Sequence, residues 1–158
     1  MQKLTPMLWF DGNAEEAANF YKSVFPGATT GDELRTGDAG PGPKGSLLTT
    51  TVTIFGQEFV LLNGGPQFKF NESISFVINA ETQEEIDKYW NLLTANGGQE
   101  SMCGWLKDKF GLSWQVCPPV LTALLTDKDA AKAGRVMQAM MKMKKIVIAE
   151  LEAAANAA

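Results

Sequence analysis

The order of structural signals in residues 4–27 returns 69 residues further along this chain of 158 residues. In the first copy an apolar stretch ends before Asn13, Glu16 stands at the capping-box spacing, and an apolar stripe of helical period follows. In the second copy Thr82 and Glu85 take the same places. Further strand-like segments follow each copy. The repeat predicts an α+β fold of two tandem βαβββ modules that pack on each other.

The remaining segments give the expected elements. The predicted strands are short, β-branched or alternating, and bounded by turn residues; they cover 4–10, 28–37, 46–56, 57–63, 73–79, 100–108 and 112–118. Helices are predicted over 14–25 and from Thr82 to Gly97-Gly98. We expect a single domain with module one at 1–66, module two at 67–120 and a helical C-terminal tail at 121–158.

The tail sequence forms helix throughout. Thr126 is its expected N-cap, with Asp129 at position N3. The predicted apolar face consists of Ala130, Ala133, Met137, Met140 and Met141. We expect this face to pack on a sheet or on a second subunit, although a cluster of methionines also suits an adaptable binding surface.

The absence of histidine is the most useful feature of the composition. It excludes Ser-His-Asp and Cys-His catalysis and histidine-ligated metals within one chain, so a metal would have only carboxylates and amides as ligands. The net charge of -4, without a basic stripe, argues against nucleic acid as a partner. No apolar run reaches the roughly 18 residues of a membrane span, and no signal peptide is evident. We therefore expect a cytoplasmic protein with no membrane partner.

Strand alternation predicts which side chains line a concave surface. In 112–118 the large apolar residues fall on one face, and the small and polar residues on the other. The same split occurs in 46–56 and 73–79. The predicted ligand-binding set combines the polar faces with an aromatic residue at the rim: Thr49, Thr51, Thr53, Ser73, Ser75, Trp105, Ser113, Gln115 and Cys117. The alternative is that these side chains fill a closed core with satisfied hydroxyl groups.

The hairpin "CGWLKDKFGLSWQVCPPV" (103–120) contains both cysteines. A nucleophilic thiol needs a base or a cation beside it to lower its pKa. Lys107, Asp108 and Lys109 are expected in the turn, at the far end from Cys103 and Cys117. The hairpin is therefore interpreted as pocket wall, with a catalytic cysteine as the alternative. The run "GDAGPGPKG" (37–45) is expected to be a surface loop, because it lies between two strands and not between a strand and a helix.

Four segments together resemble the PhnB-like family, whose members are often labelled 3-demethylubiquinone-9 3-methyltransferase. These are "LTPMLWFDGNAEEAANFYKSVFPG", "SISFVINAETQEEIDKYW", "MCGWLKDKFGLSWQVCPP" and "KAGRVMQAMMKMKKIVIAELEAA". The family belongs to the vicinal oxygen chelate superfamily, with glyoxalase I, bleomycin-resistance proteins and extradiol dioxygenases. The resemblance implies a glyoxalase-like fold in which paired modules curl their sheets around a cleft, usually in a homodimer.

The resemblance also implies positions for a divalent metal ion, on the first and last strands of each module. They fall near Leu4 or Thr5, at Val60 to Leu62, at Ser73 and at Gln115, and of these only Gln115 is a conventional ligand type. A small-molecule binding protein without a tightly held metal or cofactor is therefore expected, with a second copy of itself as partner. The alternatives are a metal-dependent or acid–base enzyme of the superfamily (a lyase, an isomerase or the labelled methyltransferase) and a dimeric interaction protein with a vestigial pocket.

Overall fold

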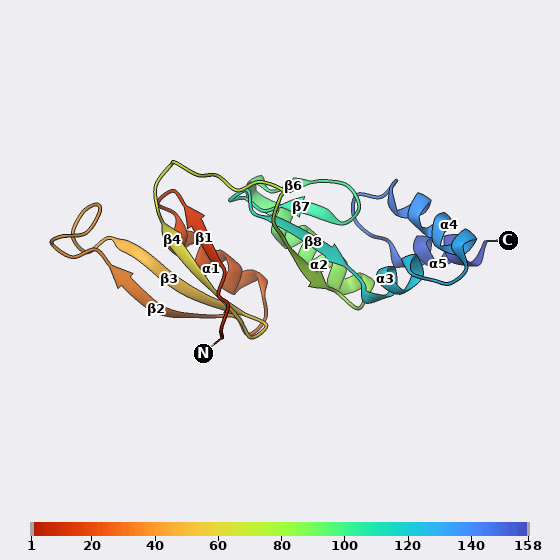
Figure 1. The fold of residues 1–158 in the computed structure, drawn as a ribbon, viewed down its shortest axis with the longest axis horizontal. Helices are drawn as coiled ribbons and strands as arrows, with labels where there is room; N and C mark the ends of the chain where they lie inside the picture. Colours follow the sequence, from red (N-terminus) through yellow and green to blue (C-terminus); the bar gives the residue numbers. More distant parts are fainter. Residues whose placement is uncertain (1, 158) are drawn as a thin grey trace. The chain divides into compact units, whose positions relative to one another are not determined.

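A computed structural model describes residues 2–157 and divides into two compact units, one ending at Phe70 and the other beginning at Asn71. The first unit contains the strands β1 (Met7–Phe10), β2 (Thr29–Arg35), β3 (Leu47–Ile54) and β4 (Gln57–Asn63), and the helix α1 (Ala14–Val24). Its sheet has the order β1-β4-β3-β2, with β1 parallel to β4 and the other pairs antiparallel. Helix α1 lies against β3 and β4 (Figure 1).

The second unit repeats this topology. It contains the strands β5 (Ser75–Asn79), β6 (Gln99–Glu100), β7 (Trp105–Lys107) and β8 (Ser113–Cys117), and the helix α2 (Gln83–Thr94), followed by the 3-10 turn η1 (Ala95–Gly97). The sheet order is β5-β8-β7-β6, with β5 parallel to β8. Helices α3 (Pro119–Leu125), α4 (Ala130–Met140) and α5 (Ile148–Asn156) complete the unit. The predicted α+β fold of tandem βαβββ modules with C-terminal helices is confirmed.

The 69-residue offset matches buried residues to buried residues in the helices but not in the first strands of the two modules. Tyr21 and Trp90, which are 69 residues apart, are both buried on the sheet side of their helices. Phe10 is buried under α1, whereas Asn79, also 69 residues on, is exposed and its neighbour Ile78 is buried. The connections 11–13 and 80–82 are equally long, so the difference lies in the phase of the strands. Because side chains of a strand alternate between faces, a shift of one residue in that phase reverses the face on which each side chain lies.

The two N-caps differ. Thr82 Oγ1 accepts the Glu85 backbone N–H at 3.2 Å, so the predicted cap of α2 is confirmed. Asn13 is the N-cap residue of α1, but the predicted side-chain cap is wrong, because its side chain makes no capping hydrogen bond. The Ala14 N–H donates instead to Asn63 Oδ1 at 2.9 Å. Asn63 also donates from Nδ2 to Leu47 O. This one amide, from the end of β4, therefore ties the start of α1 to the neighbouring strand β3.

Three predicted strands differ clearly from the structure and are shorter than expected. Ser73 lies outside β5 in an exposed turn, where its hydroxyl donates to Asn71 Oδ1, so its predicted place on the strand is wrong. The predicted strand 100–108 is interrupted between β6 and β7. Cys103 and Gly104 both have positive φ, 59° and 83°, and Trp105 N–H donates to Met102 O, which is the geometry of a type I′ turn. The first strand also starts later than predicted, at Met7.

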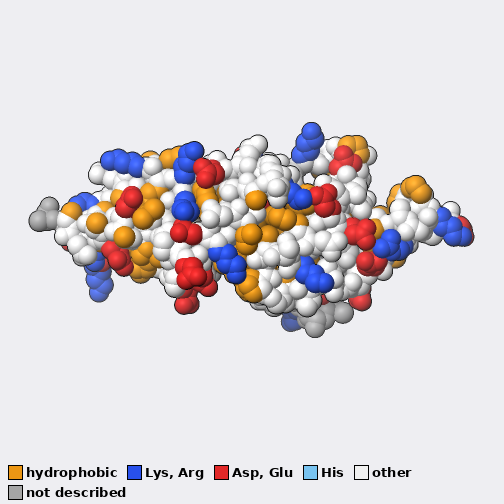
Figure 2. Space-filling model, turned by 180° about the vertical axis from the view of Figure 1, so that it is seen from behind, with side chains coloured by type: hydrophobic (Ala, Val, Ile, Leu, Met, Phe, Trp, Pro, Cys, Tyr) orange, Lys and Arg blue, Asp and Glu red, His pale blue; other side chains and the backbone are white. Residues whose placement is uncertain are grey.

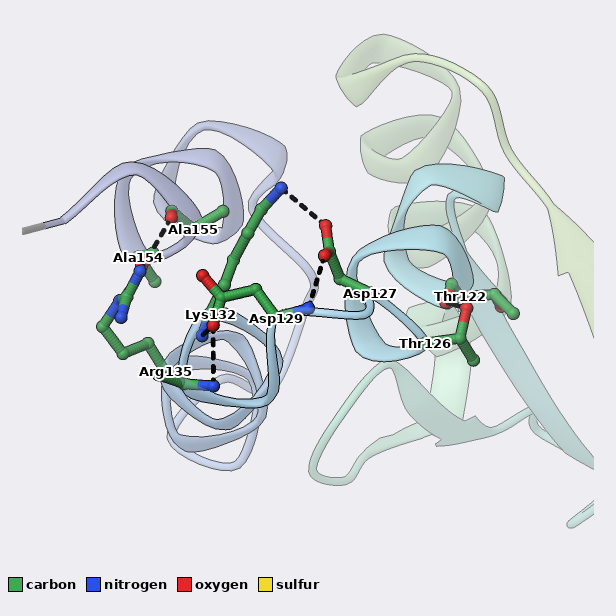
Figure 3. A network of polar contacts seen from close by, with 9 residues as sticks. Thr122, Thr126, Asp127, Asp129, Lys132, Arg135, Ala154 and Ala155 are labelled. Atoms are coloured by element: carbon green, nitrogen blue, oxygen red, sulfur yellow. Dashed lines mark hydrogen bonds and ion pairs between the residues drawn. The ribbon is translucent and has the colours of Figure 1, made fainter.

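The tail differs from its prediction at the helix ends (Figure 3). Thr126 is the C-cap of α3, and Asp129 is the N-cap of α4, where its carboxylate accepts the Ala131 and Lys132 N–H groups. Residues 141–147 are not helical. Of the predicted methionine face, Met137 is 42% exposed and Met141 62% exposed, and the buried residue of α4 is Val136. That this face packs on a second subunit stays a prediction.

Residues 143–148 attach these helices to the module. Gln83 on α2 donates to Ile146 O and accepts the Ile148 N–H. The backbone N–H groups of Cys103 and Gly104 donate to Met143 O and Lys144 O. The C-terminal helices are therefore held through backbone groups, by α2 on one side and by the type I′ turn on the other. None of the helices in the described part of the chain is long and apolar enough to span a membrane.

Candidate functional site

The second sheet has two chemically different faces. On β8 the side chains of Trp114 and Val116 are buried toward α2, while Gln115 and Cys117 point to the opposite face and are half-buried. On β5 Ile78 is buried and Val77 is 51% exposed. The opposite face is called the open face below; the side chains on it are Ser75, Val77, Asn79, Trp105, Lys107, Ser113, Gln115 and Cys117.

Four of the predicted ligand-binding residues meet at the centre of the open face. Gln115 stands beside Trp105 on β7, and Ser113 stands beside Ser75 on β5 in the strand registers. Gln115 Nε2 donates to Ser75 Oγ at 2.9 Å. Because both residues belong to paired strands, the ladder positions this amide–hydroxyl pair next to the aromatic ring.

Lys107 also belongs to this face, although it was expected in the turn. It is the last residue of β7, opposite Ser113, and it forms an ion pair with Glu72. The hydrogen bond from Lys107 is the main reason why the pKa of Glu72 lies below its usual value. Strand alternation in the sequence could have predicted this position. Leu106 is the large apolar residue that must face α2, so its neighbours Trp105 and Lys107 must both lie on the opposite face.

The structure does not favour a nucleophilic cysteine. Burial, with a smaller contribution from nearby Cys103, raises the pKa of the Cys117 thiol to about 11. A Cβ atom on Gly104 would lie 3.0 Å from Cys117 Sγ, so the type I′ turn closes over the thiol. Cys117 is therefore protonated near neutral pH and cannot act as a thiolate.

The predicted threonines lie on the first sheet. Thr49, Thr51 and Thr53 are half-buried on the face away from α1, and Thr50, Val52 and Ile54 alternate with them on the buried face. Their cross-strand partners on β4 are Leu62, Val60 and Glu58, which makes this face largely apolar. The structure thus gathers these threonines within the first unit and the serine–glutamine group within the second.

The sequence profile of the 3-demethylubiquinone-9 3-methyltransferase family matches residues 2–117. The chain belongs to this family. The PhnB protein of Bacillus cereus, assigned to the same family, is 36% identical and superposes with a TM-score of 0.67, covering 74% of this chain and 99% of that one. Like its relatives, the chain is a member of the vicinal oxygen chelate superfamily.

More distant structures share the fold. Protein PA1353 of Pseudomonas aeruginosa is 24% identical, with a TM-score of 0.59 over 73% of this chain and 96% of that one. The fosfomycin resistance protein FosX of Listeria monocytogenes is 17% identical, with a TM-score of 0.55 over 80% of this chain and 98% of that one. A comparison with functionally described proteins found no match.

The superfamily implies a divalent metal ion, but the residues at the implied positions do not fit one. Ser73 lies in a turn outside the sheet, and the β4 positions are Val60 to Leu62. Gln115 remains, and its amide is bonded to Ser75. Divalent ions of this kind bind through carboxylates or several neutral oxygens together. Within residues 2–157 no three Asp, Glu or Cys side chains are grouped to hold a metal.

The family description names a methyltransferase, but residues 2–157 contain no glycine-rich turn of the kind found in a Rossmann fold. Residues 36–46 connect β2 to β3, which pair as antiparallel strands. A nucleotide-type cofactor site of that fold needs the glycines between a parallel strand and the N-terminus of the helix that follows. This segment therefore serves as a hairpin loop, as expected from the sequence.

Proposed function

We propose that this protein binds a small polar or amphipathic molecule on the open face of its second sheet, without a tightly held metal ion or cofactor. The observation that carries the proposal is the Gln115–Ser75 hydrogen bond, held half-buried beside Trp105 by three paired strands. A few oriented polar groups next to an aromatic surface are typical of small-molecule sites. The proposal that no metal ion is tightly held is supported by the residue types at the implied metal positions, of which only Gln115 is a conventional ligand.

We also propose that the protein forms a homodimer in the cytoplasm. Met7 on the first sheet is 59% exposed and Val77 on the second 51%, and exposed apolar side chains on sheet faces suit an interface between copies. Nucleic acid and membrane are not part of the proposal. On the face in Figure 2 the Lys and Arg side chains lie among Asp and Glu side chains and form no continuous basic patch.

Native mass spectrometry of the protein purified from its host tests both proposals, because it reports subunit number and bound mass together. We expect a dimer that carries an organic molecule of a few hundred daltons. A thermal-shift screen against a metabolite panel follows, since a ligand that binds the folded state raises the melting temperature. A bare dimer that no panel member stabilises would favour an interaction protein instead, and one metal ion per subunit would favour an enzyme.

A matched pair of variants locates the site. Gln115→Leu removes the amide from the open face, and Gln138→Leu makes the same change on the exposed surface of α4. We expect the first variant to lose the ligand-induced shift and the second to keep it. Equal shifts in both variants would contradict the placement of the ligand on the open face.

A further inference from the structure

Lys107 carries a positive charge on the open face, and the group that neutralises it is not part of the sheet. Its side chain is 31% exposed and pairs with Glu72, whose side chain is 60% exposed in the turn before β5. An ion pair with so exposed a partner contributes little to stability, because water and salt compete for both charges. The carboxylate of Glu72 can therefore leave Lys107 at small cost.

The residue opposite Lys107 has an unused hydrogen-bonding group. Ser113 is paired with Lys107 across the β7–β8 ladder and is only 1% exposed. Within residues 2–157 its hydroxyl oxygen finds no hydrogen-bond partner. A buried hydroxyl without a partner is unfavourable, and this one lies on the face that also carries Gln115 and Trp105. Both observations indicate a place for an oxygen-bearing group from outside the protein.

We propose that Lys107 and Ser113 form a subsite for the negatively charged group of a small organic anion, which displaces the Glu72 carboxylate. Gln115 binds a further polar atom of the ligand, and Trp105 contacts a flat apolar part. The inference rests on the proposed binding function of the open face and names the ligand class. Carboxylates and phosphates share the required chemistry, since each accepts charge-assisted hydrogen bonds from an ammonium and a hydroxyl group.

Three probes of one shape and different charge test the proposal: benzoate, benzamide and benzylamine, with phenyl phosphate as a second anion. Binding is followed by two-dimensional NMR of the full-length protein at the indole N–H of Trp105. The indoles of Trp90 and Trp114 are internal references, because they donate to Glu100 and Asp108 on the other side of the sheet. We expect benzoate or phenyl phosphate to bind about tenfold more tightly than benzamide, and benzylamine not to bind.

Two substitutions with matched controls separate the roles. Lys107→Met is expected to abolish the preference for the anion, while Lys128→Met, on the exposed surface before α4, leaves it unchanged. Glu72→Gln removes the competing carboxylate and is expected to tighten benzoate binding roughly two- to fivefold. Glu84→Gln, an equal change of charge on α2, is expected to have no effect. Lys107→Arg keeps the positive charge and should keep the preference for the anion, so it remains informative if Lys107→Met fails to fold.

The outcomes also separate this inference from the proposed function. If panel metabolites bind at Gln115 but anions gain nothing over neutral probes, or Lys107→Met keeps the preference, the anion subsite is overturned and the binding function stands. If no metabolite and no probe perturbs Trp105 in the wild type or in Glu72→Gln, both fail. Unchanged affinity in Glu72→Gln, with the anion preference intact, would overturn the role of Glu72 as the displaced group.

Discussion

Asp108 holds the β7–β8 turn from within, and its replacement by asparagine is the sharpest test of how the open face is supported. The side chain is 2% exposed. Its Oδ1 atom accepts the Phe110 N–H at 2.9 Å and the Leu112 N–H at 3.1 Å. Its Oδ2 atom accepts the Trp114 indole N–H at 2.9 Å. One carboxylate thus satisfies two backbone donors and a buried ring nitrogen.

An asparagine at this position would have the same shape but one acceptor fewer. If Oδ1 keeps the two backbone bonds, the new NH₂ group faces the Trp114 indole N–H, and two donors oppose each other. The variant Asp108→Asn loses a hydrogen bond to a charged group, which contributes about 1.5–3 kcal/mol, and leaves a buried donor unpaired. We therefore expect it to lower the free energy of unfolding of the second unit by about 2–4 kcal/mol.

A double-mutant cycle with Trp114→Phe isolates that contact, because phenylalanine has no ring N–H. We expect Asp108→Asn to cost at least about 1 kcal/mol less in the Trp114→Phe background than in the wild type. Hydrogen exchange of peptides from β7 and β8, read by mass spectrometry, reports the second unit separately, and urea unfolding by circular dichroism reports the whole chain. Asp38→Asn, on the exposed loop, is the control. Equal costs in both backgrounds, or a loss below about 0.5 kcal/mol, would refute the reasoning.

Three further predictions concern other parts of the second unit. With a pKa of about 11, the Cys117 thiol should react with iodoacetamide at pH 8 at least tenfold more slowly than a free cysteine. Its own reaction rate should rise about tenfold for each pH unit up to pH 10, because the thiolate fraction rises by that factor. Intact-protein labelling of the Cys103→Ser variant measures both rates. Gln83→Ala should lower the free energy of unfolding by about 1–2 kcal/mol and speed limited proteolysis at 141–147, because it removes the hydrogen bonds of Gln83 to Ile146 and Ile148. Unchanged cleavage would contradict a role of these bonds in holding the segment. In thermal unfolding, Asp129→Ala should lower the free energy of unfolding by about 1 kcal/mol, because it removes the N-cap of α4. Thr126→Ala should lower it by less than half as much. A larger loss in Thr126→Ala than in Asp129→Ala would indicate that Thr126 is the cap.

The fold was predictable because two independent signals agreed in each module. A cap spacing and an apolar stripe place α1 and α2 at the same interval, and burial of Tyr21 and Trp90 confirms the stripe. The strands were less predictable in phase. A helix tolerates small shifts of its stripe, but a strand reverses its faces with each residue, so the 69-residue interval fails between Phe10 and Asn79.

The two errors at the helix ends share one physical cause, which is that a polar side chain near a chain turn has several possible partners. Asn13 stands at the N-cap of α1, yet its side chain makes no capping hydrogen bond, and the first backbone N–H of the helix, that of Ala14, donates to Asn63 from another strand. Thr126 precedes a helical sequence, yet it closes α3, and its hydroxyl donates to Thr122 O. The spacing of residues along the chain indicates which backbone N–H groups at a helix end need a hydrogen-bond acceptor. Which acceptor binds each of them depends on the tertiary structure.

Asp108 extends this argument to the candidate site. In the sequence it is one of three charged residues in succession, which indicates a solvated turn, but only the lysines on either side reach the surface. Its hydrogen bonds join β7 to β8 at one end, and the Val116 N–H donates to Gly104 O near the other. Trp105 and Lys107 are therefore positioned against Gln115 and Ser113 by contacts behind and beside the open face. A buried carboxylate on the other face of the sheet thus helps to hold together the two strands that carry the proposed ligand contacts.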